Sequence, residues 1–278
     1  MNFEYYRPSS TAELKKLLKK NKKDTYLLGG GTDLFVKLRH KTIKPSCVID
    51  IKNIKGINSI VESKKDITIG AGVSLNQLAE NNIINEYYPS LTQGAREVGS
   101  YQIRNRATLA GNICNASPAA DTLPALLIYD AKLNIISGGR KKSISIHKFF
   151  KGPGQTVLKP DEFVESVTIP KPEGVKSIFY KFSRRKAVDL STVNIAVAFV
   201  SHKSKPGIRA AVGACAAITA RAKNSEKHLA KHGLDLKSIT KAAELLPLKP
   251  ISDLRGSADF RCKIAKELFI KAVNELKN

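Results

Sequence analysis

The chain has 278 residues, 42% of them hydrophobic, and its 47 lysines and arginines against 24 acidic residues give a formal net charge of +23. No apolar run approaches the roughly 18 residues that a membrane span requires, and the opening MNFEYYRPSS lacks the apolar run and cleavage site of a secretory signal. Composition thus argues against a membrane protein, and we expect a cytoplasmic globular protein of two or three compact units.

The first 55 residues are predicted to form a small αβ unit. Side chains that can cap a helix precede a lysine-rich amphipathic stretch, and this pattern predicts a helix over 8–23. The apolar TYLL (25–28) is typical of a short buried strand, and LFVKLR (34–39) and SCVIDI (46–51) are further strand candidates. A glycine-rich loop separates the first two of these strands.

Three consecutive glycines, Gly29, Gly30 and Gly31, stand where the TYLL strand should turn. Glycine permits positive φ angles and has no Cβ, so the successive N–H groups of such a loop can surround a phosphate oxygen. Thr32 adds a hydroxyl donor, and we expect the Asp33 carboxylate to hydrogen-bond the loop's own amides. The spacing matches neither GxGxxG nor a P-loop, so the loop alone is equally consistent with a tight turn that binds nothing.

Residues 56–174 are predicted to form a second, larger α+β unit. ITIGAGV (67–73) has the pattern of a strand, and it leads to a helix that Ser74 can cap. Helical spacing recurs in SLTQGAREVG (90–99) and in DTLPALLIYD (121–130), whose first residue is the expected cap. The later elements are a strand, a turn, and a loop followed by a strand that ends at prolines: AKLNIIS (131–137), GGRKKS (138–143) and FFKGPGQTVLKPDEFVESVTIPKP (149–172).

The stretch QIRNRATLAGNICNASPAAD (102–121) is rich in small and polar residues and has no strong regular period. We expect an irregular loop here, and the backbone groups of such a loop need partners that a long polar ligand would provide. Two polar, glycine-containing loops in one α+β chain therefore suggest an extended cofactor with a pyrophosphate in its middle. The residues of this second loop that can hydrogen-bond or allow close approach are Thr108, Gly111, Asn112, Asn115, Ser117 and Asp121.

The last hundred residues have a different pattern, in which strands come first and helices follow. Such an order predicts an α+β layer arrangement. The apolar, β-rich runs are SIFYKFSR (177–184), VNIAVAFV (193–200) and IRAAVGACAAIT (208–219). The helical runs are TARAKNSEKHLAKH (219–232), SITKAAELL (238–246) and ADFRCKIAKELFIKAVNEL (258–276).

Neither a metal site nor a nucleic-acid-binding surface is predicted. The four cysteines form no CxxC pair, so we expect buried free thiols rather than an iron–sulfur cluster held by this chain. His228 and His232 are spaced to share a helical face, but no third ligand stands nearby. Basic residues are spread along the chain without a nucleic-acid motif, so we interpret the charge as a solubility feature, with docking to acidic subunits as the alternative.

Taken in order, five stretches resemble the FAD-binding medium subunit of the molybdenum hydroxylases, and most of all the separate FAD subunit of bacterial xanthine dehydrogenases. They are LLGGGTDL (27–34), QIRNRATLAGNICNASPAAD (102–121), LIYDAKL (127–133), FFKGPG (149–154) and FSRRKAVDLSTVNIA (182–196). The resemblance covers essentially the whole chain. It implies an α+β fold: an FAD-binding fold of the vanillyl-alcohol oxidase type in two subdomains (1–55 and 56–174), then a C-terminal α+β domain (175–278) with a three-stranded antiparallel sheet and helices.

The resemblance also implies an activity and partners. The chain would be an oxidoreductase subunit that holds FAD beside a large molybdopterin subunit and a small subunit with two [2Fe-2S] clusters. Electrons would pass from molybdenum through the clusters to the flavin and then to an acceptor such as NAD, and this chain would supply no catalytic acid or nucleophile. The alternatives are a standalone FAD-dependent oxidoreductase of the same fold and a basic nucleic-acid- or scaffold-binding protein.

By the same resemblance, two loops and three later positions would contact FAD. The first loop, which would wrap the pyrophosphate, is Leu27, Leu28, Gly29, Gly30, Gly31, Thr32, Asp33 and Leu34; the second is Thr108, Leu109, Ala110, Gly111 and Asn112, with Cys114 and Asn115 beside the flavin and Ser117 further on. Asp121 would accept a hydrogen bond from the flavin side, and Val164 would make a further contact. Lys181 would stabilise the negative charge that reduction places on the flavin. Gly30→Val should then abolish FAD retention and leave much of the fold intact.

Overall fold

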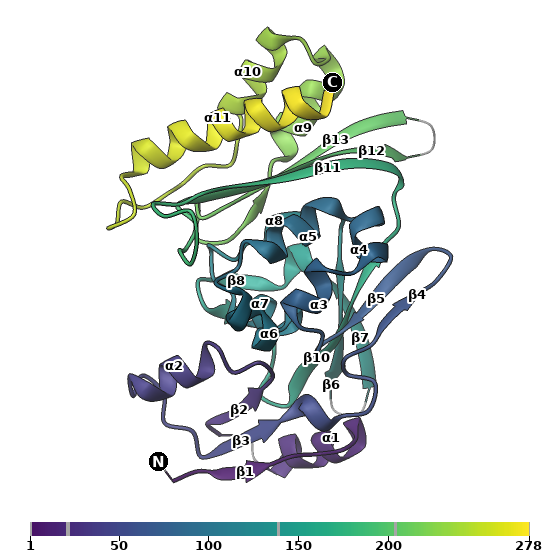
Figure 1. The fold of residues 1–278 in the computed structure, drawn as a ribbon, viewed down its shortest axis with the longest axis vertical. Helices are drawn as coiled ribbons and strands as arrows, with labels where there is room; N and C mark the ends of the chain where they lie inside the picture. Colours follow the sequence, from purple (N-terminus) through teal and green to yellow (C-terminus); the bar gives the residue numbers. More distant parts are fainter. Residues whose placement is uncertain (1, 21–22, 138–139, 203–204, 278) are drawn as a thin grey trace.

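The computed structural model describes residues 2–20, 23–137, 140–202 and 205–277. These residues form three larger sheets, of three, five and four strands, and a small two-stranded sheet. The three larger sheets follow one another along the long axis of the molecule, each with helices beside it (Figure 1). The α+β class expected from the sequence is therefore confirmed. Within the described ranges, no helix combines the length and the apolar character needed to cross a bilayer.

The first sheet is parallel, with the order β1-β3-β2, and consists of β1 (Glu4–Tyr6), β2 (Thr25–Leu28) and β3 (Cys47–Asp50). Every residue of β3 is buried because it is the central strand, which explains its continuous apolar run. Helix α1 (Thr11–Lys20) buries Leu14 and Leu18, which lie one turn apart on one face. This helix lies inside the predicted range 8–23, of which residues 21–22 fall outside the described part of the chain.

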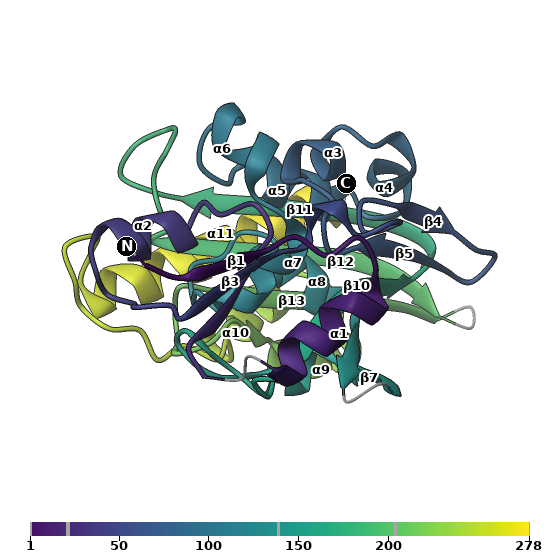
Figure 2. The same cartoon turned by 90° about the horizontal axis from the view of Figure 1, so that it is seen from below.

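The LFVKLR segment is a helix, α2 (Leu34–Arg39), so the prediction of a strand there is wrong. The Phe35 N–H donates to the Gly31 carbonyl oxygen at 2.9 Å, which turns the chain into the helix directly after the glycines. Leu38 is its one buried residue, so the apolar letters that suggested a strand do not mark a strand of the core. Seen from the end that carries the first sheet, α2 lies at the periphery of the molecule, away from α1 (Figure 2).

The second sheet is antiparallel, with the order β4-β5-β10-β6-β7. Its strands are β4 (Ile60–Glu62), β5 (Asp66–Gly70), β6 (Lys132–Ser137), β7 (Arg140–Ser145) and β10 (Glu162–Pro170). On central β10, Val167 and Ile169 lie opposite Ile69 and Ile67 of β5, and all four side chains are fully buried. The turn predicted at 138–143 is wrong for its last four residues, which belong to β7, and its first two lie outside the described ranges.

Short helices and connections surround this sheet: α3 (Leu75–Ala79), α4 (Asn82–Tyr87), α5 (Pro89–Arg96), α6 (Tyr101–Arg106), α7 (Leu109–Asn115), α8 (Leu123–Ile128), η1 (Ile51–Asn53), η2 (Ile146–Lys148), β8 (Phe150–Gly152) and β9 (Gln155–Thr156). Ser74 caps α3 as predicted, in a reciprocal capping box with Gln77. The irregular loop predicted over 102–121 is wrong, because α6 and α7 occupy most of it. Each has fewer than two turns, too few for a helical period to show, and each starts at a side-chain cap, Ser100 and Thr108 respectively.

Helix α8 begins later than predicted, and its expected cap is wrong. Thr122 holds the N-cap position without a side-chain hydrogen bond, and Pro124 in the first turn fits because its missing N–H would have had no helical partner. The Asp121 carboxylate is occupied elsewhere, in a buried polar network described below.

The third sheet is antiparallel and consists of β11 (Glu173–Phe182), β12 (Val193–His202), β13 (Lys205–Gly213) and β14 (Ala220–Arg221), in that order. It has four strands rather than the expected three because β14 pairs back onto β13. Both faces of β12 are buried: Ile195 and Val197 join the core of the helices α9 (Lys223–His232), α10 (Leu236–Glu244) and α11 (Ala258–Lys277), as predicted for this end of the chain. Ala196 and Ala198 face α5 and α8 on the other side (Figure 1).

Candidate cofactor-binding site

A cavity of about 540 Å³ lies between the glycine loop after β2 and the α6–α7 segment. Its volume falls within the ~300 to 1,000 Å³ of small-molecule and cofactor sites. Most residues expected to bind the cofactor line it: Leu27, Gly29, Gly30, Gly31, Thr32, Asp33, Leu34, Thr108, Ala110, Gly111, Asn112, Cys114, Asn115 and Val164. The sequence did not reveal the remaining lining residues: Tyr26, Lys37, Ile51, Ala71, Val98, Ile103, Ala107, Leu158, Glu162 and Phe163.

The two glycine-bearing segments touch each other at Gly30. A Cβ atom built on Gly30 would lie 1.9 Å from the Arg106 carbonyl oxygen and 2.8 Å from the Ala107 Cα. Both are backbone atoms, so a side chain at position 30 cannot be accommodated by a rotamer change. On Gly29, a Cβ would lie 3.3 Å from the Thr108 hydroxyl oxygen. The absence of side chains at these positions is therefore what lets the β2 loop close against the start of α7.

The glycine loop presents backbone donors that the protein does not use. Within the described part of the chain, no hydrogen bond is donated by the N–H groups of residues 29–33. Gly31 has a φ of +81°, a conformation that reverses the direction of successive N–H groups and favours glycine. Partly buried N–H groups of this kind require an acceptor, and phosphate oxygens are suitable acceptors. The loop therefore fits a phosphate-bearing cofactor.

Thr108 fixes the opposite wall of the cavity. Its side-chain oxygen accepts the Gly111 N–H at 3.0 Å and caps α7. On either side of it, the Leu75 N–H donates to the Ala107 carbonyl at 2.8 Å, and the Leu109 N–H donates to the Val73 carbonyl at 3.1 Å. These bonds tie the start of α7 to the α3 cap, so this wall is held from both directions.

Thr108→Ala should lower the free energy of unfolding by about 1 kcal/mol, the usual cost of a lost N-cap, and weaken FAD binding several-fold because the start of α7 loosens. Thr108→Ser, which keeps the hydroxyl, should behave like the original protein. Urea unfolding together with FAD titration of the apoprotein measures both effects. Equal FAD affinity in the alanine and serine variants would show that the cap does not hold the cavity wall.

A chain of polar contacts bridges the first and second loops at the surface. Asn115 Nδ2 donates to Asp33 Oδ1 at 3.0 Å, and Lys37 Nζ donates to Asn115 Oδ1 at 3.0 Å. The expectation that Asp33 bonds the amides of its own loop is therefore wrong. Its carboxylate instead joins α2 to the end of α7, which leaves the loop N–H groups available.

Two ionisable side chains that line the cavity each have a defined protonation state. Burial raises the pKa of the Cys114 thiol to about 12, so the thiol stays protonated at neutral pH. Burial opposes ionisation of Glu162, but hydrogen bonds from Lys142 and Ser137 outweigh it and lower the pKa of this carboxyl. Glu162 is therefore an ion-paired carboxylate with its charge compensated. Among the described residues, no cluster of three His, Cys, Asp or Glu side chains could hold a metal ion.

The remaining residues expected at the cofactor lie outside this cavity. Leu28 and Leu109 are core residues of β2 and α7, and the Ser117 hydroxyl oxygen accepts the Ala119 N–H at 3.3 Å. Asp121 and Lys181 form an ion pair with each other at 2.9 Å. Contact with the cofactor stays a prediction for these five residues and for the fourteen that line the cavity.

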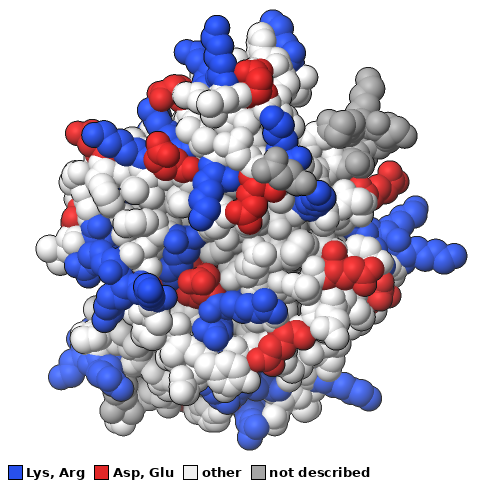
Figure 3. All heavy atoms as spheres, turned by 45° about the horizontal axis from the view of Figure 1, so that its top comes forward, with Lys and Arg blue, Asp and Glu red and all other residues white. Residues whose placement is uncertain are grey.

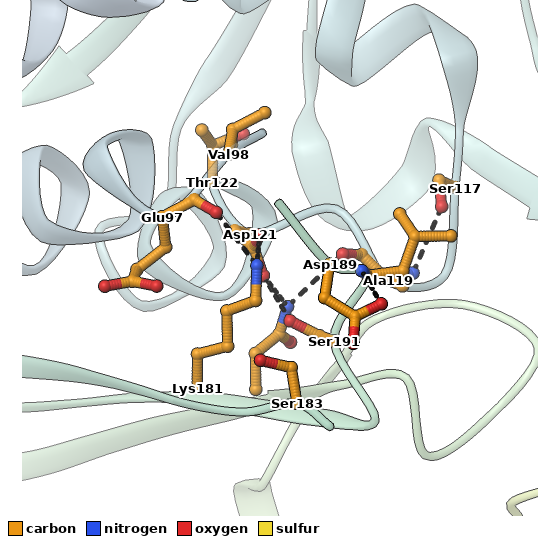
Figure 4. Close-up of polar contacts among 12 residues, drawn as sticks. Glu97, Val98, Ser117, Ala119, Asp121, Thr122, Lys181, Ser183, Asp189 and Ser191 are labelled. Atoms are coloured by element: carbon orange, nitrogen blue, oxygen red, sulfur yellow. Dashed lines mark hydrogen bonds and ion pairs between the residues drawn. The ribbon is translucent and has the colours of Figure 1, made fainter. Parts of the chain in front are cut away.

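The Asp121–Lys181 pair lies where β11 of the third sheet meets the segment just before α8, and each side chain is only 6% exposed. Lys181 Nζ also donates to the Glu97 carbonyl at 2.8 Å, while the Ser191 hydroxyl and the Asn194 amide donate to Asp121 Oδ1 (Figure 4). Burial raises the pKa of Asp121, and the Lys181 ammonium with the neighbouring hydrogen bonds opposes that rise. The network joins β11 and β12 to the turn between α5 and α6.

A second cavity, of about 360 Å³, lies on the other side of that turn. Val98 and Ile103 line the first cavity, whereas Glu97, Gly99 and Tyr101 line the second, so the 97–103 segment is a wall shared by both. Four cationic side chains contribute to the lining of the second cavity, together with Glu97 and Asp189: Arg96, Arg104, Lys181 and Lys186. Its lining is therefore cationic overall.

A glycine loop with unused N–H groups, closed against a capped helix over a cavity of this size, defines a class of protein that binds a phosphate-bearing organic cofactor. Comparison with known families gives the particular one. Residues 1–172 match the FAD binding domain in molybdopterin dehydrogenase, and residues 178–276 match the CO dehydrogenase flavoprotein C-terminal domain. The chain belongs to this family, and FAD is its cofactor. The free donors of the first loop fit the pyrophosphate of FAD, and the apolar Val98, Ile103 and Val164 offer surfaces for its rings.

Relatives extend over the whole chain. The chain is 31% identical to the xanthine dehydrogenase FAD-binding subunit of Escherichia coli O157:H7, over 98% of this chain and 94% of that one. It is 29% identical to the glyceraldehyde dehydrogenase medium chain of Sulfolobus acidocaldarius, over 99% and 98% of the two chains. Its structure is similar to a chain of the CO dehydrogenase of Oligotropha carboxidovorans, with a TM-score of 0.94, 25% identity, and coverage of 100% and 98%.

Proposed function

We propose that this chain is the FAD-binding subunit of a heteromeric molybdenum hydroxylase of the xanthine dehydrogenase type. It receives electrons from [2Fe-2S] clusters on a small partner subunit, which obtains them from a molybdopterin-containing large subunit, and passes them to an acceptor such as NAD. The observation that carries the proposal is the contact of the two loops at Gly30, which closes a cavity of about 540 Å³ in a chain similar over its full length to medium subunits of such enzymes.

The residues of this chain bind and orient the cofactor, and they leave substrate oxidation to a partner. FAD, when bound, supplies the capacity to take up electrons and release them again. The carboxylates that line the cavity, Asp33 and Glu162, are both engaged in hydrogen bonds, and the Cys114 thiol stays protonated. None of these groups is placed as a free general base or nucleophile. This supports a relay role rather than a complete catalytic site.

The proposal also covers the three units of the chain, the electron acceptor and the location of the complex. Residues 1–55 and 56–174 hold FAD between them, and residues 175–278 pack against this pair through α5, α8 and the Asp121 network. The cationic second cavity beside the shared wall supports an anionic acceptor, and NAD carries a pyrophosphate. We assign the complex to the cytoplasm.

Purification of the protein from its natural source tests this function. The expected result is a complex with one FAD per copy of this chain, in which iron- and molybdenum-containing chains co-elute. Addition of substrate should reduce the flavin, which is seen as a loss of its visible absorbance near 450 nm. Addition of NAD should reoxidise it. A yellow protein that elutes alone and is reduced directly by a substrate would favour a standalone oxidoreductase. A colourless protein that binds duplex DNA with steep salt dependence would refute the FAD assignment.

A further inference from the structure

Helix α2 has one side on the cofactor cavity and another in solvent. Leu34 and Lys37 line the cavity, and Leu38 is buried beneath the helix. The two neighbouring apolar side chains both reach solvent: Phe35, whose ring lies against Gly31 of the glycine loop, is 55% exposed, and Val36 is 51% exposed. Because an α-helix with its side chains is about 10 Å across, a partner seated on this exposed side would approach the cavity to within about one helix diameter.

The same segment is strongly basic and has no acidic residue of its own. Between residues 34 and 46 the chain has Lys37, Arg39, Lys41 and Lys44 and neither Asp nor Glu. Among the described residues, no ion pair involves Arg39, Lys41 or Lys44. On the face drawn in Figure 3, by contrast, Asp and Glu side chains lie interspersed among Lys and Arg. The cations around α2 are therefore uncompensated within this chain.

Two adjacent exposed apolar side chains on a segment whose cations have no ion pair among the described residues mark a protein-docking surface for an acidic partner. A second copy of this chain is a poor occupant, because a net charge of +23 on each copy would bring like charges together. Among the other candidate partners, the position of α2 favours one that exchanges electrons with FAD, because the exposed side of this helix gives a partner a short approach to the cofactor cavity.

We propose that the α2 face, defined as Phe35, Val36, Arg39, Lys41 and Lys44, docks an acidic surface of the iron–sulfur subunit that delivers electrons to FAD. This inference rests on the proposed function and names the surface through which it works. The apolar pair forms the centre of the contact, and the three cations form its rim and steer the approach of the acidic partner.

A double variant, Val36→Asp with Arg39→Glu, tests the α2 face in the complete complex. Neither residue lines the cavity, so the FAD content of this chain should stay at the original level. The association constant with the iron–sulfur subunit should fall at least tenfold, measured by co-elution across a dilution series. Leu236→Asp is the matched control: Leu236 is 67% exposed on α10, at the opposite end of the molecule from α2, and its replacement should leave assembly unchanged.

Hydrogen exchange of the unmodified protein gives a second, independent measurement. The amides of residues 34–46 should be protected in the complex relative to the isolated chain, and protection should disappear when the iron–sulfur subunit is removed. Unchanged assembly of the double variant, or protection that depends only on the large subunit or on a second copy, would overturn the docking proposal while FAD binding stands. A preparation in which no iron–sulfur chain accompanies the FAD chain would refute the proposed function, and the docking proposal with it.

Discussion

Replacing Gly30 with alanine should remove FAD from the protein. The new methyl group would lie 1.9 Å from the Arg106 carbonyl oxygen, which is a backbone atom and cannot rotate away. The glycine loop and the α6–α7 junction must then separate, and the N–H groups of the loop lose their position over the cavity. Overpacking of this kind costs about 1 to 3 kcal/mol, so we expect FAD to bind at least tenfold more weakly and to be lost during gel filtration. The measurement is the FAD-to-protein absorbance ratio after that step.

Two other glycines calibrate this effect. On Gly29 a Cβ would lie 3.3 Å from the Thr108 side chain, a tight contact that a small shift can relieve, so Gly29→Ala should weaken FAD binding less. On Gly207 the nearest atom would be the Val200 carbonyl oxygen at 3.7 Å, an ordinary contact, so Gly207→Ala should retain FAD fully. If Gly30→Ala kept as much FAD as Gly207→Ala, the meeting of the two loops could not be what forms the site.

The structure also changes what a larger residue at position 30 should do. The sequence suggests that Gly30→Val would abolish FAD retention and leave the fold largely intact. Because the β-carbon would strike the backbone of Arg106 and Ala107, a valine must displace the start of α7 as well. Two measurements separate the loss of stability from the loss of FAD binding. Thermal unfolding of the alanine and valine apoproteins measures how much stability is lost when the two backbone segments separate. FAD titration of the same variants measures how much binding is lost when the loop N–H groups are displaced.

Elements with long and regular patterns were predictable from the sequence. The runs of β11, β12 and α11 each extend over ten residues or more, and their apolar character is continuous or amphipathic. Helices α2, α6 and α7 have six or seven residues each, so two turns of periodicity are never completed. Caps start α6 and α7, and a Ser or Thr before a polar stretch is equally typical of a loop. The five-residue α3 and the six-residue α8 were nevertheless predicted, so length alone does not separate the successes from the failures.

Of the 24 residues that line the cavity, 14 were candidates from the sequence, through the two loops rich in glycine and small polar residues and through the family resemblance. The apolar lining was not visible: Ile51, Leu158 and Phe163 have the same character as core residues, and only the tertiary fold decides which of them face the cavity. Glu162 was not visible either, although it lies two residues from the predicted contact Val164 on β10. The pairing of Asp121 with Lys181 joins residues 60 positions apart, and no local pattern encodes such a contact.

Neutralising Asp121 should destabilise the protein more than Gly30→Ala or Thr108→Ala. In Asp121→Asn the Lys181 ammonium, whose side chain is 6% exposed, loses its counter-charge, and the amide offers one acceptor oxygen where the carboxylate offered two. Removal of one partner from a buried ion pair costs about 3 to 5 kcal/mol, because the other charge stays desolvated. Urea unfolding of the apoprotein should therefore shift to a much lower midpoint with an unchanged slope.

The double variant Asp121→Asn with Lys181→Met shows whether the loss belongs to the pair. With both charges removed, the unpaired ammonium is gone, and stability should recover to within about 2 kcal/mol of the original protein, a coupling of the size expected for residues in contact. If Lys181 also contacts bound FAD, as the resemblance implies, Lys181→Met should alter the flavin absorbance spectrum. Asn194→Leu, which removes a donor to Asp121 and to the Ala119 carbonyl, should alter stability with little spectral change. Additive losses in the double variant would mean that Asp121 and Lys181 act separately, and the buried network would then be a consequence of the packing of the third sheet against α5 and α8 rather than a cause of it.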